Sequence, residues 1–155
     1  MTAGLLKRAG MDVDQIAPRL YQGAHVHPEV HTIFLKAHGF GLHVLCAREL
    51  QPNQHRSMPL LRVHMDDCGP HEAYAEFLKA QKAAKTVFGF LDHPANEHTR
   101  VLITCHLGIN RSGLVMALVL RLMGHSPQEA IKTIRERRPK ALQNRAFLEL
   151  IEGAS

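Results

Sequence analysis

The chain has 155 residues, of which 45% are apolar and 21% charged, with a formal net charge of +5. These values indicate one soluble domain, residues 1–155, with a core of its own. No uncharged apolar run reaches the 18 residues that a membrane helix needs, and the N-terminal segment lacks the long apolar stretch of a secretory signal. Three irregularly spaced cysteines form neither a disulfide framework nor a zinc motif, and free thiols favour a cytoplasmic location.

Strand and helix signals alternate along the chain. The run RVLIT is apolar without alternation and predicts a buried strand, whereas residues 114–124 are apolar nearly all round and predict a central helix. The resulting fold class is α/β, with a central, mostly parallel mixed sheet of about five strands flanked by helices. The expected strands are residues 19–26 (an edge strand), 43–46, 60–65 and 100–104, and the expected helices are residues 27–40, 71–93, 114–124, 126–139 and 144–153.

The candidate reactive residues lie in the segment CHLGINRSG, which joins the buried strand to the central helix. Helix N-termini bind anions, Gly108 can adopt a positive φ, and the planar fork of Arg111 pairs with two phosphate oxygens. The same positive field favours a thiolate at Cys105. We therefore expect a nucleophile and a phosphate cradle in one loop. The cradle consists of His106, Leu107, Gly108, Ile109, Asn110 and Arg111.

Residues 105–113 resemble the signature loop of cysteine-dependent protein tyrosine phosphatases, and in particular the small, bacterial-type dual-specificity phosphatases. The resemblance extends over most of the chain. RLYQGA is similar to an early strand of the family, LLRVHMDD to the strand and loop that carry its general acid, and residues 135–151 to its closing helices. It implies a protein tyrosine phosphatase-like fold and needs no cofactor.

The resemblance also implies a mechanism. Cys105 would attack phosphorus to form a phosphocysteine while Arg111 and the loop amides stabilise the phosphate oxygens. Ser112 would hydrogen-bond the sulfur and assist its departure. The position of the general acid falls on Asp67, with the adjacent Asp66 as the alternative.

Two departures from the family pattern stand near the loop. The family usually has histidine before the nucleophile, where this chain has Thr104. Threonine brings no ring to order the loop, so we expect the thiol pKa and the turnover to differ from the family norm. Asn144 matches an asparagine that braces the signature loop, but Gln143 stands where proline usually precedes it.

The other two cysteines have less defined roles. Cys46 ends an apolar strand that we expect near Cys105, and it is either a small core residue or a resolving thiol that forms a disulfide with oxidised Cys105, as in some relatives. Cys68 is interpreted as a loop thiol.

Histidines and basic residues suggest further ligands. His27 and His31 have helical spacing after His25, but no acidic or cysteine ligand lies among them, so no metal is predicted. The basic run 135–140 is interpreted as a solvated helix end, favourable for the helix dipole, which could also bind an acidic partner.

The leading hypothesis is a phosphatase acting on protein phosphotyrosine, with phosphoserine and phosphothreonine as further substrates. The segment GINRSG also resembles the loop of RNA 5′-triphosphatases. Those enzymes tend to lack the acid aspartate, so the presence of Asp67 argues against RNA as substrate. Phosphoinositides are disfavoured because the loop contains no lysine. A third hypothesis is a pseudophosphatase that holds phosphopeptides with little or no turnover.

Overall fold

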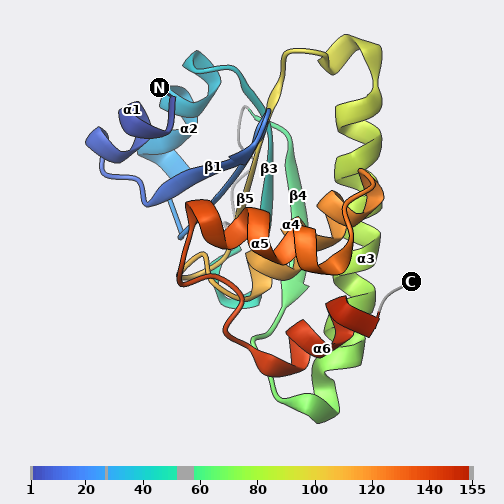
Figure 1. Ribbon diagram of the computed structural model, residues 1–155. Coiled ribbons are helices and arrows are strands. Elements are labelled where there is room, and N and C mark those ends of the chain that lie inside the picture. Colours follow the sequence, from blue (N-terminus) through green and yellow to red (C-terminus); the bar gives the residue numbers. More distant parts are fainter. Residues whose placement is uncertain (1, 27, 52–57, 154–155) are drawn as a thin grey trace.

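The computed structural model describes residues 2–26, 28–51 and 58–153. Five strands form one sheet in the order β1-β2-β5-β3-β4 (Figure 1). β1 is antiparallel to β2, and the other neighbours are parallel. This arrangement confirms the mostly parallel mixed sheet expected from the sequence. The strands are β1 (Val13–Ala17), β2 (Leu20–Gly23), β3 (Phe40–Ala47), β4 (Leu60–Met65) and β5 (Arg100–Thr104).

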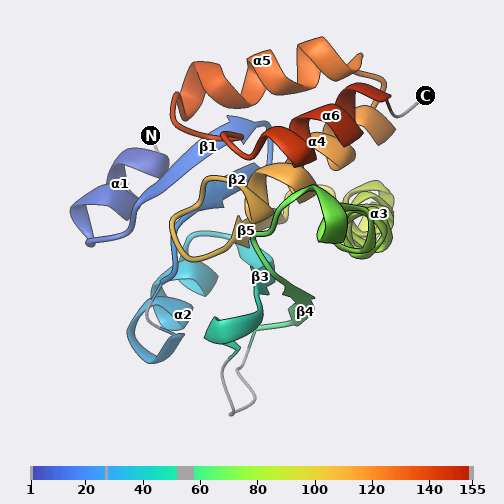
Figure 2. The ribbon, with the colours of Figure 1, turned by 90° about the horizontal axis from the view of Figure 1, so that it is seen from below.

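Helices cover both faces of the sheet (Figure 2). The smaller group consists of α1 (Thr2–Arg8) and α2 (Pro28–Ala37). The larger group consists of α3 (Pro70–Asp92), α4 (Arg111–Leu122), α5 (Pro127–Arg137) and α6 (Arg145–Gly153). Two 3-10 turns, η1 (Arg48–Leu50) and η2 (Pro94–Asn96), connect elements. Each face has an apolar core of its own, and the larger core is built around α4.

Local sequence signals explain several of these elements. α4 is buried from Arg111 through Leu120, as expected for a helix that is apolar nearly all round. α5 begins with the predicted capping box, in which Ser126 and Glu129 each bond the backbone N–H of the other.

The N-terminal region differs from the prediction. α1 and β1 were not predicted, and the expected edge strand is wrong, because β2 lies between β1 and β5 inside the sheet. β1 is short and carries Asp14 and Gln15 in its centre, so it lacks the apolar run that marks a buried strand.

The parallel strands place the functional loops together. β3, β4 and β5 run in the same direction, so their carboxyl ends meet at one edge of the sheet. Leu45 pairs with Thr104, and Ala47 pairs with Met65. The chain leaves these ends through η1, the segment 66–69 and the loop that starts at Cys105. Ligands of α/β folds bind at such an edge.

Candidate active site

The loop from Cys105 to Asn110 encloses a hollow of about 120 Å³. Gly108 has a φ of +70°, and a Cβ there would lie 2.6 Å from the carbonyl oxygen of Gly23. Both the backbone angle and the space therefore require glycine. The hollow is lined by Asp67, Cys105, His106, Leu107, Ile109, Asn110 and Arg111.

Cys105 lies at the base of this loop and is 4% exposed. Its Sγ is 3.2 Å from the hydroxyl oxygen of the buried Ser112 in the first turn of α4. The structure thus brings the two residues together as the sequence predicted. A hydroxyl in this position can donate a hydrogen bond to a thiolate.

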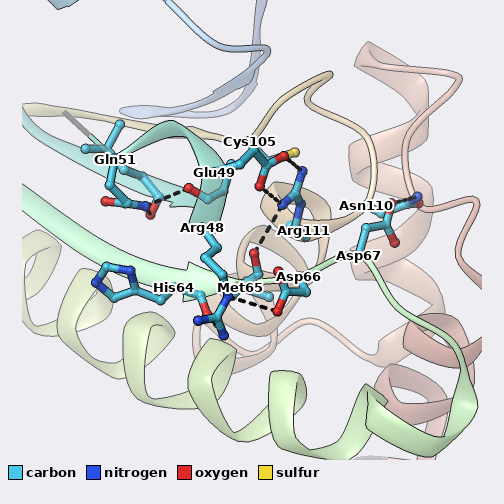
Figure 3. A network of polar contacts seen from close by, with 12 residues as sticks. Arg48, Glu49, Gln51, His64, Met65, Asp66, Asp67, Cys105, Asn110 and Arg111 are labelled. Atoms are coloured by element: carbon cyan, nitrogen blue, oxygen red, sulfur yellow. Dashed lines mark hydrogen bonds and ion pairs between the residues drawn. The ribbon is translucent and has the colours of Figure 1, made fainter.

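Arg111 is held by a carboxylate that was not predicted to belong to the site. Its two terminal nitrogens donate to the two oxygens of Glu49 at 2.6 and 2.8 Å, and Nη1 also donates to the carbonyl of Met65 at 3.1 Å (Figure 3). The hydrogen bond from Arg111 lowers the pKa of Glu49 to about 2, and the same bond raises the pKa of Arg111. In the sequence, Glu49 lies in the segment LCAREL, just beyond the end of β3. This position at the carboxyl end of a strand was the signal that could have identified it as a site residue.

The two adjacent aspartates point to different partners (Figure 3). Asp67 lines the hollow, and its carboxylate accepts amide N–H groups from Asn110 at 2.9 Å and Asn144 at 2.7 Å. Asp66 instead pairs with Arg48 at 2.9 Å and does not line the hollow. The geometry therefore favours Asp67 over Asp66 for contact with a bound ester.

Asn110 and Asn144 join the segment of Asp66 and Asp67 to the loop that starts at Cys105. The Oδ1 of Asn110 accepts the backbone N–H groups of Gln143 and Asn144, both at 2.8 Å. Proline at position 143 would have no N–H to donate, so the departure from the family pattern supplies one of these bonds. Asn144 also donates to the carbonyl of Cys68 at 2.8 Å.

A second arginine, Arg138, braces the loop from behind. It donates to the carbonyls of Gly108 at 2.7 Å and Leu107 at 3.0 Å, and it pairs with Asp12 and Asp14. Burial alone would lower the pKa of Arg138, but the two aspartates raise it. The expected solvated helix end is wrong here, because Arg138 is 7% exposed.

The remaining loop residues form the rim. His106 and Leu107 are exposed, and the backbone carbonyl of His106 accepts the N–H of His25 at 3.0 Å. The Ile109 carbonyl accepts the N–H of Leu142 at 2.9 Å, which ties the loop to the segment before α6. These contacts leave the rim side chains able to meet a substrate.

Cys46 is fully buried in the same apolar core as Cys105. Burial raises the pKa of its thiol well above the usual value, and the neighbouring Cys105 raises it further. Cys46, Cys68 and Cys105 are all free thiols. Burial also raises the pKa of Cys68, which lies half-buried directly after Asp67.

Thr104, the residue before Cys105, contacts a histidine ring. Its Oγ1 lies 2.7 Å from Nε2 of His43 on β3, and both side chains are buried. The loop thus has a ring beside it, supplied by the neighbouring strand. Sequence reasoning missed this pair because it joins residues 61 positions apart.

The structure also bears on metals and membranes. Among the described residues, no group of three or more His, Cys, Asp or Glu side chains is placed to hold a metal ion, and His27 of the suspected histidine group lies outside those residues. No helix in the described ranges combines the length and apolar character needed to cross a bilayer.

A sulfur, a guanidinium and a carboxylate around one anion-sized hollow define the site of a cysteine-dependent phosphatase. The family described as "Dual specificity phosphatase, catalytic domain" matches residues 20–153. The chain belongs to this family, and it is a protein tyrosine or dual-specificity phosphatase that hydrolyses phosphomonoesters through a phosphocysteine intermediate.

Solved structures show the same fold. Human DUSP28 superposes with a TM-score of 0.69 at 23% identity, covering 90% of this chain and 92% of its own. A mouse putative dual specificity phosphatase, crystallised with zinc tungstate, gives 0.68 at 24%, with 90% and 86% covered. Cydia pomonella PTP-2 phosphatase gives 0.67 at 22%, with 92% and 89% covered. No curated protein sequence matches the chain, and membership of a bacterial-type subgroup stays a prediction.

Proposed function

We propose that Cys105 is the nucleophile of this phosphatase and that its substrates are phosphotyrosine, phosphoserine and phosphothreonine in proteins. One observation carries the proposal: Cys105 and Arg111 of the loop and Asp67 from a separate part of the chain line the same hollow of about 120 Å³. The hollow has a size suited to a phosphoryl group, and a nucleophile, a cation and a carboxyl group converge on it.

In the first step, the Cys105 thiolate forms a bond to phosphorus while the bond from phosphorus to the ester oxygen breaks. Asp67 gives its proton to that leaving oxygen. Arg111 pairs with the phosphoryl oxygens. Glu49 and Met65 occupy both hydrogens of Nη1 and one of Nη2, so the hydrogen of Nε and the second hydrogen of Nη2 remain for two phosphate oxygens.

In the second step, water attacks phosphorus and Asp67, now a carboxylate, accepts a proton from it. The sulfur leaves as a thiolate, which the hydroxyl of Ser112 stabilises from 3.2 Å. Asn110 and Asn144 hold the carboxylate of Asp67 over the hollow between the two steps.

Hydrolysis of p-nitrophenyl phosphate and of a phosphotyrosine peptide tests these roles. Cys105→Ser should abolish turnover, and Asp67→Asn should lower kcat about 100-fold or more on the peptide, as general acids commonly contribute. Asp66→Asn is the matched control and should stay within about twofold, because Asp66 does not line the hollow. Equal losses in Asp66→Asn and Asp67→Asn would contradict the assignment of the acid.

A second candidate is RNA 5′-triphosphatase activity, which the loop sequence GINRSG suggests. Each oxygen of Asp67 accepts one amide N–H group and keeps a further lone pair, so these bonds do not exclude Asp67 as the acid. An anhydride leaving group needs little protonation. Phosphate release from 5′-triphosphate RNA that is faster than from the phosphopeptide, and insensitive to Asp67→Asn, would reverse the ranking. Phosphopeptide binding without turnover by the wild type would indicate a pseudophosphatase.

We also propose a cytoplasmic location. The three described cysteines are free, and a thiolate nucleophile stays reduced in such a compartment.

A further inference from the structure

The strand that delivers the nucleophile is tied to its neighbour by one buried side-chain bond. Thr104 is the last residue of β5, and its Oγ1 lies 2.7 Å from Nε2 of His43 on the adjacent parallel strand β3. His43 is 5% exposed and Thr104 is 2% exposed. On the opposite side of β5, the bond from the Cys105 N–H to the carbonyl of Gly23 in β2 is long, at 3.4 Å.

Thr104 and Cys105 face opposite sides of the sheet. Cys105 belongs to the core around α4, whereas Leu102, which shares the face of Thr104 by strand alternation, belongs to the core under α1 and α2. A bond that fixes Thr104 therefore fixes the backbone from which Cys105 projects, without contacting the sulfur.

The histidine in this pair is uncharged. Burial, and to a smaller extent the nearby His25, lower the pKa of His43 to about 3. A neutral imidazole has one N–H and one lone pair, and a hydroxyl can match either of them. The ring can therefore hold Thr104 at all working pH values, but it adds no positive charge that would stabilise the Cys105 thiolate.

We propose that His43 is a positioning residue for the nucleophile: through Thr104 it fixes the end of β5 and so sets the place of Cys105 relative to Ser112 and Arg111. The inference rests on the proposed role of Cys105. The same strand, β3, leads into η1, which carries the Glu49 that holds Arg111. β3 thus holds both the sulfur, through Thr104, and the guanidinium, through Glu49, and their separation depends on this one strand.

The test compares kcat and KM on p-nitrophenyl phosphate. Thr104→Val keeps the side-chain shape and removes the hydroxyl, and we expect it to lower kcat about tenfold or more with KM within about twofold, because small misplacements of reacting groups cost rate. Thr104→Ser should restore kcat to within about threefold of the wild type. His43→Gln, which offers polar atoms near the position of Nε2, should retain more activity than His43→Leu.

Two comparisons separate positioning from a loss of fold. The double variant of His43→Leu and Thr104→Val should have a kcat no lower than that of the less active single variant, because both substitutions remove the same bond. Phe40→Leu is the control: Phe40 lies on β3 in the core under α2 and is not bonded to Thr104. It should lower the melting temperature and leave kcat within about twofold.

Three results would overturn the inference. They are a wild-type kcat in Thr104→Val, a loss of kcat in the double variant equal to the product of the two single losses, and a loss of kcat in Phe40→Leu equal to that in Thr104→Val at matched stability. If His43→Leu does not fold, the Thr104→Val and Thr104→Ser pair decides. If the wild type shows no turnover, the proposed function fails separately, and the rate of Cys105 alkylation by iodoacetamide, followed by mass spectrometry, tests the inference instead. That rate should change in Thr104→Val and return in Thr104→Ser; no change would overturn the inference.

Discussion

Glu49 offers the sharpest test of how this site is organised, because its carboxylate contacts Arg111, the residue that we propose binds phosphate. One interpretation is that Glu49 competes with phosphate for Arg111. The geometry favours the other interpretation, in which Glu49 orients Arg111, since the hydrogen of Nε and one of Nη2 are not used by Glu49 or Met65. Glu49→Gln preserves the shape, removes the charge and turns an amide donor toward the guanidinium.

The size of the effect follows from the pKa of Glu49, which falls from its ordinary 4.5 to about 2. At 1.36 kcal/mol per pH unit this corresponds to about 3 kcal/mol. The side chain of Glu49 is 50% exposed, and solvent screening reduces the value to about 1–2 kcal/mol. On the premise that Arg111 needs this orientation equally in the transition state, we expect Glu49→Gln to lower kcat/KM about 5- to 30-fold.

The assay is kcat/KM on p-nitrophenyl phosphate near neutral pH, with the exposed Glu97→Gln as the control. An unchanged or higher kcat/KM in Glu49→Gln would refute the reasoning and show that the carboxylate competes with phosphate. Urea unfolding gives an independent check. The pKa of Glu49 is lower in the folded state, so its stabilising contribution is present above about pH 4.5 and is lost as the pH falls toward about 2. The difference in the free energy of unfolding between wild type and Glu49→Gln should therefore be constant above about pH 5 and shrink below that.

Three further predictions concern the loop and the second thiol. Gly108→Ala should lower both the melting temperature and kcat, because its Cβ would meet Gly23 at a φ of +70°, whereas Gly89→Ala, where a Cβ has open space, should be neutral or slightly stabilising. Arg138→Met should cost about 3 kcal/mol by removing a buried ion-pair partner, and Arg138→Lys should recover only part of it; equal stability of all three proteins by urea unfolding would contradict the bracing role. Peroxide should give a disulfide between Cys46 and Cys105 that dithiothreitol reverses, and Cys46→Ala should then lose activity irreversibly; the same recovery in both proteins would show that Cys46 is only a core residue.

The sequence by itself determined which of the candidate site residues share the loop, and it predicted most of the elements that surround it. Cys105, Gly108 and Arg111 lie within one turn between a strand and a helix, so their proximity follows from chain connectivity alone. β5, α4 and α5 were also predictable, because an unbroken apolar run, an all-round apolar helix and a capping box are signals within a few consecutive residues. β1 carried no such signal.

Only the tertiary structure decided which distant residues serve that loop. Glu49 reaches Arg111 across 62 positions and Arg138 reaches Asp12 across 126, and these contacts depend on how strands are ordered and registered in the sheet. Asp66 and Asp67 are identical in type and adjacent in sequence, yet only Asp67 lines the hollow, whereas Asp66 pairs with Arg48. The local sequence does not determine which of the two side chains lines the hollow. That choice is set by the packing of β4 against β3 and α3, which joins residues far apart in the chain.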